Sequence, residues 1–231
     1  VTFTETTISG NSAGRSGGGI LTISPTLIVR TTVSNNAAGE FGGGLYMLGL
    51  GVGSTTIIMS STISGNSTGI DGGGIYLPTG ANVDIHSTSI IHNRAGLSGT
   101  GSGGGIFTYT FLVSGLSNDI IADNTAPTFP DCGPRILSTG YGLFVSGGGC
   151  TTMASDQVVA DASALGLGPL ADNGGPTQTH LPLASVPSPA IDQGGCVVSS
   201  ADQRAFHSPF DTALPNAVGG NGCDIGAVEF N

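Results

Sequence analysis

Lysine and tryptophan are absent from this 231-residue chain, and charged residues of all kinds make up only 9% of it. Ordinary soluble domains carry about 25% charged residues. Acidic side chains outnumber the five arginines, so the formal net charge is −10. A surface with so few cations cannot neutralise a phosphate backbone. The sequence therefore predicts no nucleic-acid partner.

Long apolar runs are also absent. A membrane-spanning helix needs about 20 consecutive apolar residues, and no such run occurs in this chain. No window of a dozen residues combines helical spacing of apolar residues with capping residues. We therefore predict no membrane span in this chain and an all-β structure.

Cysteine is scarce, and all four residues lie after residue 130. An even number of cysteines in an exported protein favours disulfides. Three pairings are open. We favour the sequential one, because each pair then brackets a segment rich in glycine and proline: Cys132 with Cys150, and Cys196 with Cys223. Zinc-type spacings such as CxxC are missing, which argues against a metal site.

Glycine is abundant, with 41 residues, and much of it belongs to a repeated phrase. Each copy has an apolar residue three positions before an Asn, and all copies but the last continue with a glycine triplet and another apolar residue. The repeated Asn residues are Asn11, Asn36, Asn66, Asn93 and Asn124, separated by 25, 30, 27 and 31 residues. Repeats of this length indicate one structural unit stacked on itself.

Within the repeats, apolar residues alternate with Ser and Thr over short runs, which is typical of strands. Three short strands with glycine corners fit one coil of a right-handed parallel β-helix (β-solenoid), with coils about 4.8 Å apart. We expect the five Asn to form a ladder at one corner, where their amides bond the backbone or one another. The apolar residues three positions earlier should form an inner column: Ile8, Val33, Ile63, Ile90 and Ile121.

The chain changes character near residue 150. Residues 1–150 carry the coils, whereas residues 151–231 hold seven of the twelve prolines and show little alternation. Since the open end of a solenoid exposes unpaired strand edges, we predict that residues 151–231 form an irregular, disulfide-bonded C-terminal capping and packing segment of the same domain.

Two sets of motifs resemble known families. Ser-Gly-Asn followed by Gly-Gly-Gly-Ile resembles the repeats of bacterial surface β-helix proteins of the polymorphic outer-membrane protein type. The tail carries LGPLADNGGPTQTH at 167–180, SPAID at 188–192, DQR at 202–204 and CDIGAVE at 223–229. These blocks resemble the choice-of-anchor Q proteins, a family of secreted bacterial and archaeal parallel β-helix proteins. The resemblance implies a prokaryotic extracellular or cell-surface location and no catalytic residues.

Parallel β-helices include pectate-lyase-like and polygalacturonase-like enzymes, so a polysaccharide lyase or glycoside hydrolase is the first alternative function. A lyase needs carboxylates for calcium and a basic residue to abstract a proton, and a hydrolase needs facing carboxylates. The basic candidate is Arg94, and paired carboxylates are sparse around it. His92 and Asp123 align next to the Asn ladder, as either an acid–base pair or a surface hydrogen bond. We favour a non-enzymatic protein.

Other side chains have two interpretations each. The tail aspartates Asp172, Asp192, Asp202 and Asp224 are weak calcium candidates, or they bond their own backbone in turns. No other cofactor is expected. Arg15 and Glu40 occupy equivalent positions in adjacent coils and predict an ion pair that Asp71 could join. Asn66 begins an N-glycosylation sequon.

Aromatic residues follow three of the glycine triplets. Tyr46, Tyr76 and Phe107 should stack on the outer face in one column, with Leu21 beside them, because adjacent strand residues face opposite ways. Such a strip fits a glycan-binding module, which is the second alternative function. It also fits a contact with another subunit, or a partly buried ladder that stabilises the sheet.

The first coil, at Val1, Thr2 and Phe3, has no lysine or proline to guard its edge. An unguarded edge is a template for another chain. We therefore predict end-to-end assembly into filaments, with Val228 and Phe230 as donor residues; a capping segment before the first coil is the alternative. The sequence as a whole favours a structural or adhesive cell-surface protein whose partner is itself or a cell-surface polysaccharide.

Overall fold

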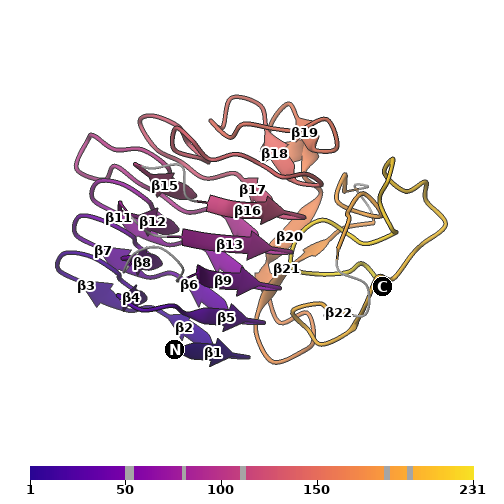
Figure 1. Cartoon of the computed structure of the whole chain (residues 1–231), viewed down its shortest axis with the longest axis horizontal. Coiled ribbons are helices and arrows are strands. Elements are labelled where there is room, and N and C mark those ends of the chain that lie inside the picture. The colour runs from indigo at the N-terminus through magenta and orange to yellow at the C-terminus, as the bar shows by residue number, and fades with distance from the viewer. Residues whose placement is uncertain (50–54, 80–81, 110–112, 185–187, 197–199) are drawn as a thin grey trace.

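The computed structural model describes residues 1–49, 55–79, 82–109, 113–184, 188–196 and 200–231. Its coils lie one on another in a parallel β-solenoid (Figure 1), which confirms the predicted fold class. Among these residues the only helical element is one turn of 3-10 helix, η1 (Ala162–Ala164). No helix in the described part of the chain is long and apolar enough to cross a membrane.

Four parallel sheets form the sides of the solenoid. The first sheet contains β1 (Thr2–Thr4), β5 (Leu27–Val29), β9 (Thr55–Met59), β13 (Asn82–His86) and β16 (Val113–Ser117). The second contains β2 (Thr7–Ser9), β6 (Thr32–Ser34), β10 (Thr62–Ser64), β14 (Ser89–Ile91), β17 (Ile120–Ala122), β18 (Leu143–Val145) and β19 (Gln157–Val159). The third contains β3 (Ser12–Ala13), β7 (Ala37–Ala38) and β11 (Ser67–Thr68). The fourth contains β4 (Ile20–Thr22), β8 (Leu45–Met47), β12 (Ile75–Leu77) and β15 (Ile106–Thr108).

The register brings equivalent residues of each repeat into columns inside the tube. In the second sheet the column runs through Ile8, Val33, Ile63, Ile90 and Ile121 and continues to Phe144. A matching column in the fourth sheet runs through Ile20, Leu45, Ile75 and Ile106. All of these side chains belong to one core cluster, although Ile8, in the first coil, is only partly buried. Alternation of apolar and small polar residues therefore places one face of each strand in the core.

Two corners of each coil have left-handed backbone. The residue before each ladder Asn has φ between 55° and 68°: Gly10, Asn35, Gly65, His92 and Asp123. The residue two positions before β2, β6, β10, β14 and β17 has φ between 45° and 59°: Glu5, Arg30, Ser60, Ser87 and Asn118. Gly, Asn and Asp tolerate this region best. The sharp corners are thus built by local backbone geometry rather than by long loops.

The tail lies beside the coils rather than across their end (Figure 1). After β19 the chain leaves the second sheet and forms two antiparallel pairs: β20 (Leu167–Ala171) with β21 (Thr179–Pro182), and β22 (Ser200–Ala201) with β23 (His207–Ser208). Its apolar residues Leu165, Ala190 and Ile225 pack on the outward-facing Ile91 and Ile120 of the second sheet. The segment that we predicted to cap and pack thus packs on the outer face of the second sheet.

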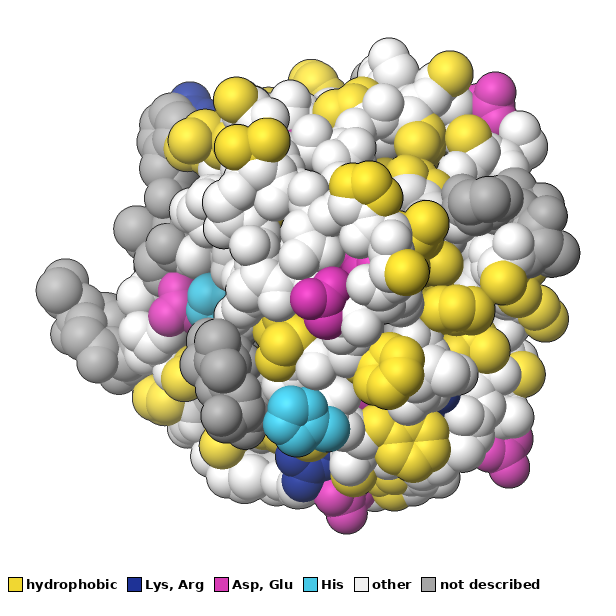
Figure 2. Space-filling model, turned by 90° about the vertical axis from the view of Figure 1, so that its right-hand side faces the viewer, with side chains coloured by type: hydrophobic (Ala, Val, Ile, Leu, Met, Phe, Trp, Pro, Cys, Tyr) yellow, Lys and Arg dark blue, Asp and Glu magenta, His cyan; other side chains and the backbone are white. Residues whose placement is uncertain are grey.

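Polar contacts fix the tail to the same sheet. The side-chain amide of Gln203 accepts a hydrogen bond from Thr62 Oγ1 at 2.6 Å and donates one to Thr32 Oγ1 at 2.8 Å. His180 Nε2 lies 2.9 Å from Ser64 Oγ. The face of the molecule on the tail side is mostly uncharged, with a few acidic, arginine and histidine side chains among hydrophobic ones (Figure 2). The outer face of the second sheet is thus the docking surface for the tail.

Candidate functional site: corner ladders, tail and aromatic column

The five repeat Asn form one continuous hydrogen-bonded ladder. Each Nδ2 donates to the Oδ1 of the Asn in the next coil at 2.9–3.0 Å, and the backbone N–H of each Asn donates to the same oxygen. Asn36, Asn66, Asn93 and Asn124 are buried, whereas Asn11 is exposed. Because Asn66 has no exposed surface and both ends of its amide are bonded, the sequon that it begins is not accessible.

Sequence reasoning missed the residue that ends this ladder. Asp131 Oδ1 accepts from both the backbone N and Nδ2 of Asn124, each at 2.9 Å. An ionised carboxylate has no N–H to donate to a further residue, so the ladder ends at Asp131. Burial raises the pKa of Asp131 to about 6. Its signal in the sequence was weak, because Asp131 follows Asn124 by only seven residues, far less than a repeat.

Each glycine of the triplet has a separate function. The first has positive φ, as in Gly42 and Gly72 at 64° and 69°. The second touches neighbouring backbone: a Cβ on Gly43 would lie 2.3 Å from Ser67 O. The third packs on the ladder, since a Cβ on Gly44 would lie 3.1 Å from Asn66 Nδ2. Asn and the triplet therefore recur together because the amide ladder needs a surface without side chains.

A second polar ladder lies at the neighbouring corner, five residues before each Asn, and sequence reasoning missed it as well. The backbone N–H of Thr6 bonds Thr31 Oγ1, that of Thr31 bonds Ser61 Oγ, and that of Thr88 bonds Asp119 Oδ1 at 2.8 Å. Asp119 is fully buried, and burial raises its pKa well above the usual range. Its Oδ2 has no partner among the described residues. Both ladders thus reach an aspartate at the fifth coil.

His92 and Asp123 face each other at the left-handed corner. His92 Nε2 lies 2.9 Å from Asp123 Oδ2, and both side chains are about half exposed. They line a cavity of about 270 Å³ between the second sheet and the tail, together with Ser163 and apolar residues such as Leu165. The Ser163 hydroxyl donates to Asp161 Oδ1 at 2.5 Å. A hydroxyl that is already bonded to a carboxylate is not activated by the histidine.

His180 packs edge-on against His92, with ring centroids 5.2 Å apart. Its Nδ1 lies 2.8 Å from Gly168 O, an atom that can only accept, so Nδ1 carries the proton and Nε2 accepts from Ser64. Burial lowers the pKa of His180 to about 4. His180 is therefore a neutral structural contact between tail and sheet.

The acidic residues of the tail blocks hold the tail together. Asp202 forms a buried ion pair with Arg204 at 2.9 Å and accepts from the backbone N–H of Phe206. Asp224 accepts from the backbone N–H of Asp192 at 2.8 Å and from that of Phe230. Burial raises the pKa of Asp224 to about 7. These contacts match the turn chemistry that was the alternative to calcium binding.

The remaining tail acids are used in the same way. Asp192 accepts from the backbone N–H and hydroxyl of Thr212. Glu229 accepts from Ser208 Oγ at 2.6 Å and from the backbone N–H of Phe210 at 3.1 Å, and burial raises its pKa. Asp172 is the exposed member of the set and accepts from the N–H of Gly174 at 3.1 Å. Calcium binding by the four aspartates remains a prediction.

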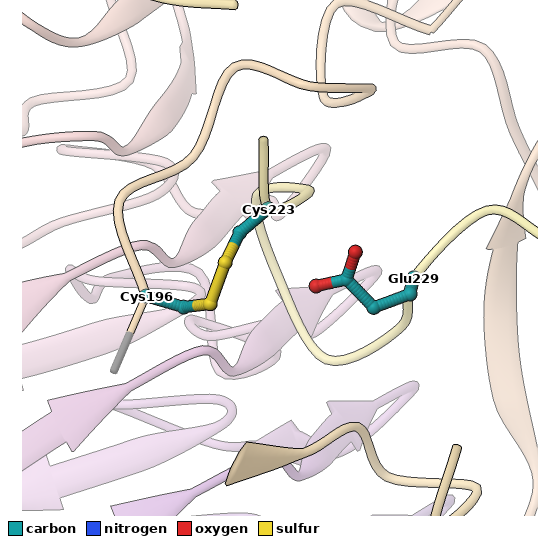
Figure 3. Close-up of side chains that lie close together, drawn as sticks. All are labelled: Cys196, Cys223 and Glu229. Carbon is teal, nitrogen blue, oxygen red and sulfur yellow. A yellow bond between two sulfur atoms is a disulfide. The ribbon is translucent and has the colours of Figure 1, made fainter. Parts of the chain in front are cut away.

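One cluster in the described part of the chain brings three residues of metal-binding types within 4.8 Å of one another, namely Cys196, Cys223 and Glu229 (Figure 3). The two sulfur atoms are bonded to each other, so neither is a thiolate that can bind a metal. The second disulfide joins Cys132 to Cys150. Cys132 pairs with Ile106 and so extends the inner column. The sequential pairing that we favoured is the one in the structure.

The predicted aromatic strip is mostly buried. Tyr76 stacks on Tyr46 and on Phe107, with centroids 5.2 and 5.7 Å apart. Tyr76 and Phe107 are each 5% exposed, whereas Tyr46 is half-buried. Phe41 and Tyr109 add further contacts to Tyr76. The column is therefore a packed ladder that is accessible mainly at the Tyr46 end.

The structure also shows the contacts of the predicted ion pair and of other charged residues in the coils. Arg15 Nε lies 2.9 Å from Glu40 Oε2, on the surface. Asp71 does not join this pair, because its carboxylate accepts from Ser102 N at 2.8 Å and from Tyr109. Arg94 is exposed, and its backbone pairs with Ser67 and Thr125 on either side.

The predicted assembly residues lie in different places. Val1 and Thr2 are exposed at the open edge of the first coil, and Phe3 is partly buried against the core. Val228 is 3% exposed and Phe230 is half-buried. Both belong to the tail, residues 151–231. Val228 is therefore a packing residue in this structure, and the donor role of Phe230 stays a prediction.

Comparison with known proteins agrees with this architecture. Residues 5–23 and 60–78 match the family model described as the Chlamydia polymorphic membrane protein repeat. Each match spans a ladder Asn and the glycine triplet after it. No curated protein and no solved structure matches the chain.

The parallel coils make this a β-helix repeat protein, and two of its repeats are similar to those of the Chlamydia polymorphic membrane proteins. The resemblance of the tail to choice-of-anchor Q proteins stays a prediction.

Proposed function

We propose that this protein is a non-enzymatic structural element of a prokaryotic cell surface and that its coils stack end to end, copy on copy. The observation that carries the proposal is the parallel register of the coils, in which each coil presents the same backbone edge and the same inward column to the next one. β1, β2, β3 and β4 are each the last strand of their sheet. An unpaired edge is a template for a further strand, and here four edges lie at one end of the tube.

The geometry of that edge suits a parallel coil. Thr32 N donates to Thr6 O at 2.9 Å, and Gly10 N donates to Ser34 O at 3.2 Å. Bonding alternates along a parallel strand, so Thr7 and Ser9 direct their N–H and C=O groups away from β6, toward the open side. Asn11 Oδ1 lies at the acceptor end of the Asn ladder, where it can accept a hydrogen bond from an amide of an added coil.

The apolar interior is also open at this end. Ile8 and Phe3 point into the tube, yet both are only partly buried. At the other end, β19 is the last strand of the second sheet, and its Val158 is 51% exposed. Joining these two different ends is a heterologous contact, which produces a filament unless the rotation closes a ring.

The chemistry of the buried acids supports a non-enzymatic role. The tail carboxylates Asp192, Asp202, Asp224 and Glu229 accept hydrogen bonds from protein groups. Catalytic carboxylates must instead face substrate or water. A polysaccharide lyase or hydrolase remains the alternative, and the His92–Asp123 pair is its candidate centre.

Electron microscopy and light scattering of the purified protein test the stacking. Thr7→Pro removes an outward N–H and places a ring on the edge, without removing a bond within the chain. We expect filaments in the wild type and in the matched control Thr7→Ala, and monomers in Thr7→Pro with a nearly unchanged melting temperature. A monodisperse monomeric wild type at high concentration contradicts the proposal. That result is expected if a coil preceding residue 1 in a longer chain covers the edge.

A further inference from the structure

The exposed end of the aromatic column opens into a groove of about 540 Å³ on the side of the first coils. Leu21, Tyr46 and Tyr76 line one wall, and Ala13, Ser16 and Phe41 line the other. The wall forms because the middle residues of β4, β8 and β12 face away from the core. The groove lies on the flank of the tube rather than at its ends.

Aromatic residues concentrate here in a chain that is otherwise poor in them. The chain has nine Phe, four Tyr and no Trp. Three of the four tyrosines, Tyr46, Tyr76 and Tyr109, join Phe41 and Phe107 in one contact network. Core packing does not require this, since the inner columns are built from aliphatic residues and Phe144.

The aromatic column ends at Tyr46, and one face of the Tyr46 ring is not covered by another ring. Tyr46 stacks on Tyr76 on one side, at 12° between ring planes. On the other side its neighbour in register is Leu21, which is 55% exposed. Leucine is shorter than tyrosine and has no ring, so the second face of Tyr46 is bordered by the groove. A free aromatic face beside polar groups is the usual composition of a small-ligand site.

Hydrogen-bonding groups line the same groove. Arg15 borders it and is paired through Nε with Glu40. Its side chain is 80% exposed, which leaves the terminal guanidinium nitrogens directed to solvent. Ser16 contributes a hydroxyl to the lining. Planar groups with several donors and acceptors suit the adjacent hydroxyls of a sugar.

We propose that this groove binds a neutral glycan, with one pyranose ring stacked on the free face of Tyr46 and its hydroxyls bonded by Arg15 and Glu40. The charge of the protein decides between neutral and acidic polymers. The net charge is −10, and the cation at the groove is already paired with Glu40, so a polyanion is repelled. The inference does not depend on end-to-end stacking, because the groove is lateral.

Affinity electrophoresis tests the inference with polymers cast into a native gel. The neutral probes are hydroxyethyl cellulose, dextran and galactomannan, and the acidic probes are alginate and polygalacturonate. We expect at least one neutral polymer to retard the protein and the acidic ones not to. Since the chain has no tryptophan, tyrosine emission on titration with oligosaccharides of the retained polymer gives a second readout.

Three variants localise the binding. Tyr46→Ala should weaken retention about tenfold, the loss expected for one stacking contact. Arg15→Ala, at a largely exposed position that does not affect folding, should weaken it several-fold. The matched control Phe210→Ala removes an aromatic that is 48% exposed in the tail and should change nothing. The proposal is overturned if no neutral polymer retards the protein, if acidic polymers alone do, or if folded Arg15→Ala binds like wild type.

Discussion

Apart from Asp71, Asp119 and Asp131, the buried polar groups of the coils are neutral amides and hydroxyls, whereas the tail buries several carboxylates and a guanidinium. In the coils, the side chains of Asn66 and Ser61 satisfy backbone groups of the neighbouring coil without carrying charge. In the tail, Asp202, Asp224 and Glu229 do so with ionisable groups that are at most 5% exposed. Neutral groups cost less to bury than charged ones, and a ladder lets each amide be satisfied by its own copy. A tail without repetition has no such copies and uses stronger, charge-assisted bonds.

The two regions also differ in the sequence separation of their contacts. Each coil bonds mainly to the coils on either side of it, so its contacts are repeated along the chain. The tail instead bonds residues far apart in sequence, such as Gln203 and Thr62, which are 141 residues apart. We therefore expect damage in the coils to spread along the tube and damage in the tail to remain more local.

The largest effect should come from a charge inside the tube. Ile63 has no exposed surface and lies in the middle of the inner column. Ile63→Asp should lower the free energy of unfolding by more than about 4 kcal/mol, since no partner for the charge is available there. The matched control is Val29→Asp, on the outer face of β5, with a cost of about 1 kcal/mol. Thermal unfolding measures both, and equal melting temperatures would remove Ile63 from the core.

A smaller effect is expected when one amide of the ladder is removed. Asn66→Ala deletes the bonds of Nδ2 to Val33 O and Asn93 Oδ1, together with the oxygen that accepts from Asn36. We expect a loss of about 2–4 kcal/mol, because several buried groups are left unsatisfied. Asn11→Ala removes two exposed bonds of the same type and should cost below about 1 kcal/mol. Equal costs at the two positions would show that the ladder does not act as a buried network.

The repeats made the coils predictable from sequence. Five Asn with an apolar residue three positions earlier identified the parallel coils and the inner column of Ile63. The hydroxyl ladder was missed because Thr and Ser are common throughout the chain and Asp119 breaks the pattern. Asp131 was missed because it lies only seven residues after Asn124.

Much less of the tail structure could be predicted from its sequence. Its Pro and Gly content indicated irregular structure, but nothing local indicated which surface it would cover. Its position depends on contacts such as His180 with Ser64, 116 residues apart. Val228 looked like a free terminal residue, yet it is buried because the tail folds back on itself. Distant contacts without a repeat leave no periodic signal in a single sequence.

The pH dependence of stability should distinguish the two regions. The Asp224 carboxyl has a pKa of about 7 when folded and about 3.9 when unfolded. It binds more protons when folded, so the free energy of unfolding falls as pH rises from about 4 to about 7. His180, with a folded pKa of about 4, acts in the opposite direction up to about pH 6.5. Between about pH 6.5 and 7.5 the Asp224 effect should therefore dominate within the tail.

Melting temperatures of wild type and Asp224→Asn across pH 5–8 measure this effect. We expect wild type to lose about 2 kcal/mol over the range, on the scale of 1.4 kcal/mol for each unit of pKa shift, and the variant to lose less. Asp131→Asn provides the comparison in the coils, where the folded pKa is about 6 and the decline should end nearer pH 6. A variant that keeps the full wild-type slope at pH 6.5–7.5 would assign the effect to another group.

The smallest effect is expected where the two regions meet, at His92 and Asp123. Both side chains are exposed, by 48% and 40%, and an exposed pair contributes at most about 1 kcal/mol. His92→Ala should therefore leave the melting temperature nearly unchanged. If the protein is non-enzymatic, acidic polysaccharides should yield neither unsaturated products that absorb in the ultraviolet nor new reducing ends. The cavity that the pair lines includes Ser163 from the tail. Turnover that is lost in His92→Ala or Asp123→Asn, but kept in the coil variant Arg94→Ala, would show that coil and tail together form an active site.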